Sequence, residues 1–255
     1  MDDSDLLKYD AAVPRYTSYP TAPHFAADVD EAQYRSWLGG IPREATLSLY
    51  VHVPFCASLC WFCGCQMRVV NRYGPVRDYL DLVATEVAQV ADALPHKGRV
   101  THTHFGGGTP TLISGPDFIG FVDTLRRHFD FSEAAEIAVE IDPRRFSRER
   151  AVVLGEGGVN RASLGIQDFD DEVQRAINRL QSFDETRDAV DWLRAAGITG
   201  ISFDLLYGLP HQTEAKVLDS IDQALTLEPD RVSLFGYAHV PWVKPHQKQI
   251  GRAHV

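Results

Sequence analysis

The sequence predicts an α/β fold: an open, partial (β/α)6 barrel of the TIM type with parallel strands, preceded by an irregular N-terminal extension. Strand-like and helix-like segments alternate six times, which implies right-handed crossovers and a parallel sheet. Chemically distinctive residues follow the strand ends, the edge at which parallel α/β proteins place their active sites. No Gly/Ser-rich linker or block of charge divides the 255 residues. A doubly wound sheet is the structural alternative.

Six short segments rich in β-branched, aromatic and aliphatic residues are the expected strands: 46–53, 100–105, 135–141, 161–166, 201–206 and 231–237. Between them, apolar residues recur at three- and four-residue spacing, the period of a helix with one buried face. The expected helices are 75–94, 116–129, 148–154, 171–178, 184–196 and 214–227. Six strand–helix units rather than eight predict a barrel that stays open.

Composition and charge set the class of protein. With 44% hydrophobic and 24% charged residues, the chain is typical of a water-soluble globular protein. A net charge of −10 argues against broad binding to nucleic-acid phosphates, although a locally basic pocket could still hold an anionic small molecule. The first residues lack the pattern of a secretory signal, and no apolar run approaches the roughly 20 residues that span a bilayer. We therefore expect a cytoplasmic monomer with no nucleic-acid partner and no membrane span.

All four cysteines fall within ten residues, at Cys56, Cys60, Cys63 and Cys65. Disulfides stabilise most when they join distant segments, so this concentration favours one thiolate-bound cofactor. Thiolates suit zinc or iron–sulfur clusters. Structural zinc sites usually take two pairs of ligands from separated segments, whereas this loop is too compressed for four sulfurs around one ion. Three cysteines at x3–x2 spacing can hold three corners of a [4Fe–4S] cubane and leave one iron open. A non-enzymatic zinc-binding module stays open as an alternative.

The other distinctive residues lie at the corresponding position of each later unit. Three glycines with Thr109 follow the second strand, and Glu140 and Asp142 close the third. Gln167 and Asp168 follow the fourth strand, and Asp204 lies near the end of the fifth. Glycines there can form only a tight turn, and strand-end carboxylates can be solvated or cap helices. His102 and His104 alternate along one strand and are left unassigned.

The spacing Cys56-x3-Cys60-x2-Cys63 matches the cluster motif of the radical S-adenosylmethionine (SAM) superfamily. The larger frame from Tyr50 to Cys65 closely resembles the oxygen-independent coproporphyrinogen III dehydrogenases of haem biosynthesis. The resemblance extends from residue 15 to residue 241, nearly the whole chain. The related haem-chaperone branch typically carries Asp-Phe after its third cysteine, where this chain has Gly-Cys, so the dehydrogenase branch is favoured.

The resemblance implies a role for particular residues. Cys56, Cys60 and Cys63 would ligate the cluster, and SAM would chelate the fourth iron. Two SAM molecules are implied. The first would contact Tyr50, Gly107 and Glu140, and the second would be surrounded by Phe62, Gly108, Thr109, Gln167, Arg179, Asp204 and Ala238. Cys65 matches the family's fourth cysteine, which is not a regular cluster ligand, and is a candidate catalytic residue. Without this frame, Arg179 would pass as a surface cation of a helix.

The resemblance also implies a reaction. A 5′-deoxyadenosyl radical would take a β-hydrogen from a propionate of coproporphyrinogen III, and loss of carbon dioxide and one electron would leave a vinyl group. Two such events give protoporphyrinogen IX. Such chemistry needs a cofactor and a one-electron donor such as a flavodoxin or ferredoxin. A radical-SAM haem chaperone or haem-degrading relative, which would bind intact haem, is the other alternative.

The expected domains are an N-terminal extension over 1–45, a radical-SAM partial barrel over 46–243 and a truncated tail over 244–255. The last six residues, Ile-Gly-Arg-Ala-His-Val, resemble the translation of a common sequencing adapter. Members of the family carry a further C-terminal domain, which we expect to be absent from this chain. The fragment is therefore expected to convert little or no porphyrinogen, because its active-site face would be open on one side.

Overall fold

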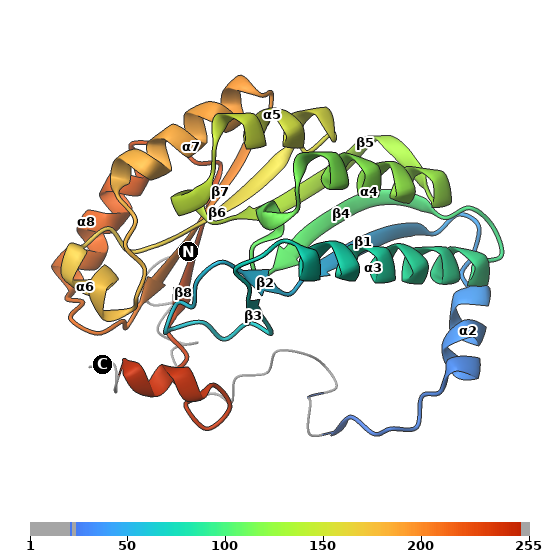
Figure 1. Ribbon diagram of the computed structural model, residues 1–255, viewed down its shortest axis with the longest axis horizontal. Helices are drawn as coiled ribbons and strands as arrows, with labels where there is room; N and C mark the ends of the chain where they lie inside the picture. Colours follow the sequence, from blue (N-terminus) through green and yellow to red (C-terminus); the bar gives the residue numbers. More distant parts are fainter. Residues whose placement is uncertain (1–20, 22–23, 251–255) are drawn as a thin grey trace, which may run out of the picture.

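A curved sheet of six parallel strands forms the centre of the computed structural model, which describes residue 21 and residues 24–250 (Figure 1). The strands are β1 (Thr46–Val53), β4 (Arg99–Gly107), β5 (Asp130–Ile141), β6 (Arg161–Gln167), β7 (Gly200–Tyr207) and β8 (Arg231–Gly236). Their order in the sheet is their order in the sequence, and every neighbouring pair is parallel. A doubly wound sheet reverses its strand order, so this order confirms the open partial barrel and excludes the alternative.

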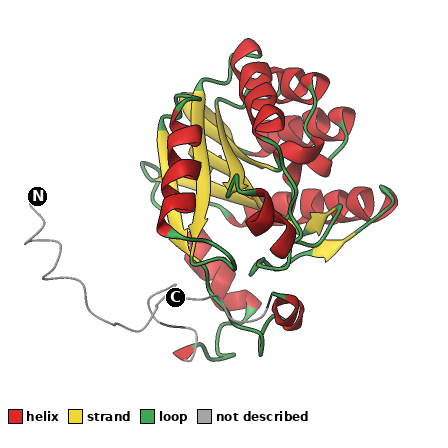
Figure 2. Ribbon diagram, turned by 90° about the vertical axis from the view of Figure 1, so that its left-hand side faces the viewer, coloured by secondary structure: helices red, strands yellow, loops and turns green. Residues whose placement is uncertain are grey.

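Helices lie along the outer side of the arc, as Figures 1 and 2 show. They are α3 (Gly74–Ala93), α4 (Gly115–His128), α5 (Arg148–Glu156), α7 (Phe183–Ala195) and α8 (Glu214–Leu225). The short helix α6 (Asp171–Ala176) lies instead at the carboxyl edge of the sheet, where its end contacts the cysteine loop. Four of the outer helices begin at a hydroxyl side chain that accepts a hydrogen bond from the backbone N–H three residues on; these residues are Ser114, Ser147, Ser182 and Thr213. Each cap satisfies a backbone donor that the helix itself leaves free.

The hydrophobic core fills the space between the helices and the sheet. On α4, the buried residues are Phe118, Phe121, Val122 and Leu125, the face that the three- and four-residue spacing predicts. The ring of Phe118 packs against Phe105 of β4, with ring centroids 5.3 Å apart. Burial of each such side chain contributes about 1.5–3 kcal/mol to the stability of the fold. This packing holds α4 against β4, whose carboxyl end forms part of the pocket described below.

Two features differ from expectation. The short strands β2 (Phe55–Cys56) and β3 (Arg68–Val69) pair with each other in parallel, but two-residue strands leave no periodic pattern in a sequence. A helix, α2 (Glu31–Gly39), lies in the segment expected to be irregular. This helix begins at the cap Asp30, and none of its residues is buried. Its sequence therefore lacks the periodic apolar face from which a helix is predicted.

Every helix among the described residues is too short or too polar to traverse a bilayer. The family-like segment over 15–20 and most of the adapter-like hexapeptide, residues 251–255, lie outside the described residues.

Candidate functional site

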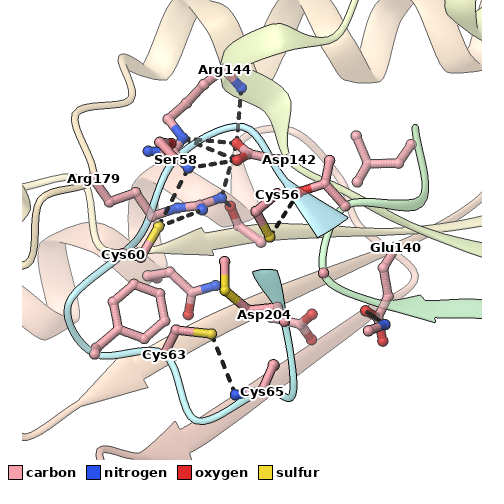
Figure 3. A pocket seen from close by; sticks show the side chains of 18 of the residues that line it. Cys56, Ser58, Cys60, Cys63, Cys65, Glu140, Asp142, Arg144, Arg179 and Asp204 are labelled. Atoms are coloured by element: carbon pink, nitrogen blue, oxygen red, sulfur yellow. Dashed lines mark hydrogen bonds and ion pairs between the residues drawn. The ribbon is translucent and has the colours of Figure 1, made fainter. Parts of the chain in front are cut away.

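A pocket of about 270 Å³ opens at the carboxyl ends of the strands, between the cysteine loop and the ends of β4 to β7 (Figure 3). Twelve of the residues that the family resemblance assigns line it: Cys56, Cys60, Phe62, Cys63, Cys65, Gly107, Gly108, Thr109, Glu140, Gln167, Arg179 and Asp204. These residues come from the carboxyl-terminal parts of β4, β5, β6 and β7 and from the loops that follow β1, β4 and β6. The parallel topology therefore brings them to one place, as the strand-end rule predicts.

Two residues of the predicted set do not line this pocket. Tyr50 is 59% exposed; its hydroxyl lies 3.0 Å from Nδ1 of His52, and its ring stacks on that of His104. Ala238 is exposed beyond the end of β8, and its carbonyl accepts a hydrogen bond from Gln247 at 3.1 Å. Tyr50 stands beside the pocket, because a Cβ placed on Gly106 would lie 2.9 Å from both the Tyr50 ring and the Glu140 carboxylate.

The cysteine loop is pinned at its base and along its side. At the base, the backbone N–H of Val70 donates to the carbonyl of Cys56 at 2.9 Å across the β2–β3 ladder. Along its side, the side chain of Asn178 donates to the carbonyl of Leu59 at 2.7 Å, and the N–H of Trp61 donates to Ile177 at 2.9 Å. The segment around α6 therefore holds the part of the loop between the first and third cysteines.

The four thiols are free and have unlike environments. Burial raises the pKa of Cys56 to about 11, although a hydrogen bond from Thr109 opposes the shift. A hydrogen bond from Cys65 lowers the pKa of Cys63 to about 6, and the same interaction raises the pKa of Cys65. Thiolates are the form that binds metals, so loading a metal here releases protons, from Cys56 in particular.

On one side of the pocket, two arginine side chains contact the carboxylate of Asp142. Arg144 pairs with Asp142 at 2.6 Å, and Arg179 approaches the same carboxylate at 3.3 Å. Burial would raise the pKa of Asp142, but the hydrogen bond from Arg144 and the charges of both guanidinium groups lower it below its usual value. Arg179 also donates to the carbonyl of Gly165 and is only 6% exposed, so it is not the surface cation that its local sequence indicates.

The opposite side of the pocket is acidic. The Glu140 carboxylate accepts a hydrogen bond from the backbone N–H of Gly107 at 3.0 Å and lies 3.1 Å from Nε2 of His104. Asp204 accepts a hydrogen bond from the Ser163 hydroxyl at 3.0 Å. Burial, followed by the negative charge of Glu140, raises the pKa of Asp204, against the hydrogen bond from Ser163. Two carboxylates therefore face a cavity that also holds thiols and guanidinium groups.

The glycines at the carboxyl end of β4 allow close packing against the start of the cysteine loop. Gly107 has a φ of +112°, a backbone conformation that residues other than glycine rarely adopt. A Cβ on Gly108 would lie 2.5 Å from the carbonyl oxygen of Phe55, inside van der Waals contact. Gly106 and Gly107 belong to β4 rather than to a turn, and the N–H of Gly108 continues the pairing by donating to the carbonyl of Val53 at 2.8 Å. Gly107 and Gly108 form part of the pocket wall. Gln167, at the end of β6, also has a positive φ of 73°.

Sequence reasoning missed several residues of the site. Arg144 lies in Asp142-Pro-Arg-Arg, where two adjacent arginines close behind a strand-end carboxylate were an available signal. Ser163 carried no signal, because a single serine in a strand is common. The 3₁₀ turn Pro245–Gln249 was assigned to the tail, yet Gln247 is fully buried and donates to the carbonyl of Phe62 at 2.9 Å. His246 donates to the carbonyl of Cys63 at 2.8 Å.

The residues present fit an iron–sulfur cluster at Cys56, Cys60 and Cys63. All three carry free thiols, and all line one pocket. An N–H or O–H donor lies 3.4 Å from each sulfur: the Thr109 hydroxyl from Cys56, the Arg144 guanidinium from Cys60 and the Cys65 backbone N–H from Cys63. Such donors stabilise cluster-bound thiolates. Within the described residues, no group of three His, Cys, Asp or Glu side chains is placed to hold a single metal ion.

The curved parallel sheet carries the Cys-x3-Cys-x2-Cys loop at its carboxyl edge, a motif that resembles that of the radical SAM superfamily. The family model described as the radical SAM superfamily matches residues 50–224. The chain therefore belongs to the radical SAM superfamily, as the cysteine spacing predicts, and the predicted class of cofactor, an iron–sulfur cluster with SAM, is confirmed at the level of the family.

Within the superfamily, the chain is similar to coproporphyrinogen III oxidases. It is 51% identical over 240 residues to the oxygen-independent coproporphyrinogen III oxidase of Bradyrhizobium diazoefficiens, covering 94% of this chain and 53% of that protein. It is 47% identical to the enzyme of the same name from Paracoccus denitrificans, covering 95% and 54%. The structure of coproporphyrinogen III oxidase from Escherichia coli, a radical SAM enzyme, superimposes with a TM-score of 0.88 at 38% identity, covering 97% of this chain and 55% of that one. The chain spans about half the length of these relatives.

Proposed function

We propose that this chain forms the radical SAM part of an oxygen-independent coproporphyrinogen III oxidase. The observation that carries the proposal is the pocket itself: twelve of the fourteen residues that the family resemblance assigns line one cavity or its cysteine rim. The relatives that are 47–51% identical carry the name of this activity. The reaction is the oxidative decarboxylation of two propionates of coproporphyrinogen III to vinyl groups, giving protoporphyrinogen IX.

In this proposal Cys56, Cys60 and Cys63 hold a [4Fe–4S] cluster. When bound, the cluster and SAM supply the one-electron cleavage that generates a 5′-deoxyadenosyl radical. The amino and carboxylate groups of SAM would bind the iron that the three cysteines leave open. The carboxylate of Glu140, which accepts a hydrogen bond from the Gly107 N–H at 3.0 Å, offers an acceptor for N–H donors of this first SAM.

The remaining predicted residues would divide between two SAM molecules. Tyr50, Gly107 and Glu140 would contact the first, which agrees with the hydrogen bond between the Gly107 N–H and Glu140. The second would be surrounded by Phe62, Gly108, Thr109, Gln167, Arg179, Asp204 and Ala238. Asp204 and Arg179 lie on the walls of the same cavity and carry opposite charges, as expected for a zwitterionic ligand.

The protein's own contribution is to position reactants and to exclude water. A carbon-centred radical attacks any near neighbour, so the reacting C–H bond must be held against it and other groups kept away. Phe62 supplies apolar surface at the wall of the pocket, and Gln247 and His246 hold the backbone of the cysteine loop in place. We further propose that the protein acts as a cytoplasmic monomer supplied by a flavodoxin or ferredoxin.

The first test is metal and acid-labile sulfide analysis of anaerobically purified and reconstituted protein. About four irons and four sulfides per chain are expected for one cubane cluster, whereas a zinc module would bind one zinc and no sulfide. The second test adds SAM, a reductant and coproporphyrinogen III under anaerobic conditions. Formation of 5′-deoxyadenosine, carbon dioxide and protoporphyrinogen IX supports the proposal. Tight binding of intact haem without decarboxylation contradicts it and supports the haem-chaperone alternative.

A further inference from the structure

The Cys60 sulfur is the only one of the four cysteine sulfurs, among the described residues, to lie within hydrogen-bonding reach of arginine side chains. Nη2 of Arg144 lies 3.4 Å from it, and Nη1 of Arg179 lies 3.6 Å away (Figure 3). Cys60 is also the one buried thiol of the described chain, with 7% exposure. Charge placed beside this sulfur is therefore poorly screened by solvent.

Arg144 is held in place by a carboxylate rather than by the sulfur alone. Its Nε donates to Asp142 at 2.8 Å and its Nη2 at 2.6 Å, a two-point contact that fixes the plane of the guanidinium group. The side chains of Arg144 and Asp142 are only 14% and 15% exposed. The two guanidinium groups and one carboxylate leave a net positive charge next to Cys60.

We propose that Arg144 is a positioning residue for the cluster: its guanidinium group, oriented by Asp142, donates to the Cys60 sulfur and raises the reduction potential of the cluster bound there. Hydrogen bonds to cluster sulfurs and nearby positive charge both favour the reduced, more negative form of a cluster. Nothing in the proposed function requires this residue to contact SAM or porphyrinogen. The inference rests on the cluster assignment in that function.

The chain supplies a matched control. Arg145 is the next residue, carries the same charge and is exposed to solvent. Arg145→Ala removes one positive charge from the same turn without removing a donor to sulfur. Arg144→Leu removes both the charge and the donor, and Asp142 keeps Arg179 as a partner, so no buried carboxylate is left unpaired. Arg144→Lys keeps the charge but loses the planar, two-point contact.

The experiment measures iron and sulfide in the four reconstituted proteins, and then the midpoint potential of each cluster by a redox titration followed by electron paramagnetic resonance. We expect Arg144→Leu to lower the equilibrium constant for one-electron reduction about tenfold, equivalent to about 59 mV, and Arg144→Lys to have a smaller effect in the same direction. Arg145→Ala is expected to stay within about twofold of the parent protein, because an exposed charge is screened.

Equal potentials in the Arg144→Leu and Arg145→Ala proteins would overturn the inference while leaving the proposed function intact. Loss of iron from both Arg144 variants, with full iron in Arg145→Ala, would show a structural role and would also overturn it. If the parent protein itself assembles no cluster, the proposed function fails first. The iron analysis detects loss of the cluster from the variants or from the parent protein, and the titration then compares the potentials of the proteins that keep it.

Discussion

Asp117, in the first turn of α4, hydrogen-bonds residues at the start of α3. Its replacement by asparagine tests whether this contact stabilises the segment that connects the pocket to α4. The carboxylate accepts hydrogen bonds from the Tyr73 hydroxyl at 2.5 Å, from Arg77 at 2.7 Å and from Ser114 at 2.7 Å. The backbone N–H of Ser114 in turn donates to the Tyr73 hydroxyl at 2.9 Å. The network therefore fixes Ser114, the last residue of the segment between β4 and α4.

The magnitude follows from the pKa of Asp117, which the hydrogen bonds from Arg77, Tyr73 and Ser114 lower from 3.8 to about 2. At about 1.4 kcal/mol per unit, the upper limit is about 2.5 kcal/mol of stability. The side chain is 18% exposed and its partner Arg77 is 63% exposed, so solvent screening reduces the expected loss in Asp117→Asn to about 1–2 kcal/mol at pH 7.

The sign of the pH dependence is determined by the lowered pKa. Because the folded state binds the proton less tightly than the unfolded state, this stability is present above about pH 4 and is lost as the pH falls toward 2. Urea unfolding of the two proteins at several pH values from 7 to 3 should show a difference in unfolding free energy that is constant near neutrality and shrinks at the acidic end.

A control is available on the same helix. Asp123 is an exposed carboxylate of α4, so Asp123→Asn is expected to change stability by less than about 0.5 kcal/mol. A difference between the parent and Asp117→Asn that does not change between pH 7 and pH 3 would refute the charge-based reasoning. If the Asp117→Asn protein were as stable as the parent at pH 7, the network would make no contribution to stability and the prediction would be wrong.

Three further predictions concern the pocket. Cys63→Ala should lose the cluster, because it removes one of three thiolate ligands; about four irons per chain after reconstitution would contradict the ligand assignment. Cys65→Ala should keep its iron but impair turnover, and iron loss equal to that of Cys63→Ala would show that both sulfurs are ligands. Gly108→Ala should destabilise the chain by about 1–3 kcal/mol, because its Cβ would lie 2.5 Å from the backbone oxygen of Phe55. The control Gly120→Ala has open space around its Cβ within α4 and should stabilise the helix by up to about 1 kcal/mol, so thermal unfolding should shift in opposite directions.

Local chemistry allowed the sequence to predict much of this protein. The alternation of strands and helices and the buried face of α4 depend on residues a few positions apart, so they are visible in the sequence itself. The cysteine spacing likewise identifies the superfamily, because the motif lies within one loop. The rule that parallel strands share a carboxyl edge then placed most of the pocket residues together.

Other features were decided only by the tertiary structure. Arg144 and Arg179 reach the Cys60 sulfur from 84 and 119 residues away, and His246 reaches the cysteine loop across 183 residues. Such contacts depend on the curvature of the sheet and on the path of each connecting loop, neither of which leaves a periodic pattern. In the sequence, Arg179 is a cation beside a helix; in the fold, it is buried against a thiol because the α6 segment packs on the loop that carries Cys60.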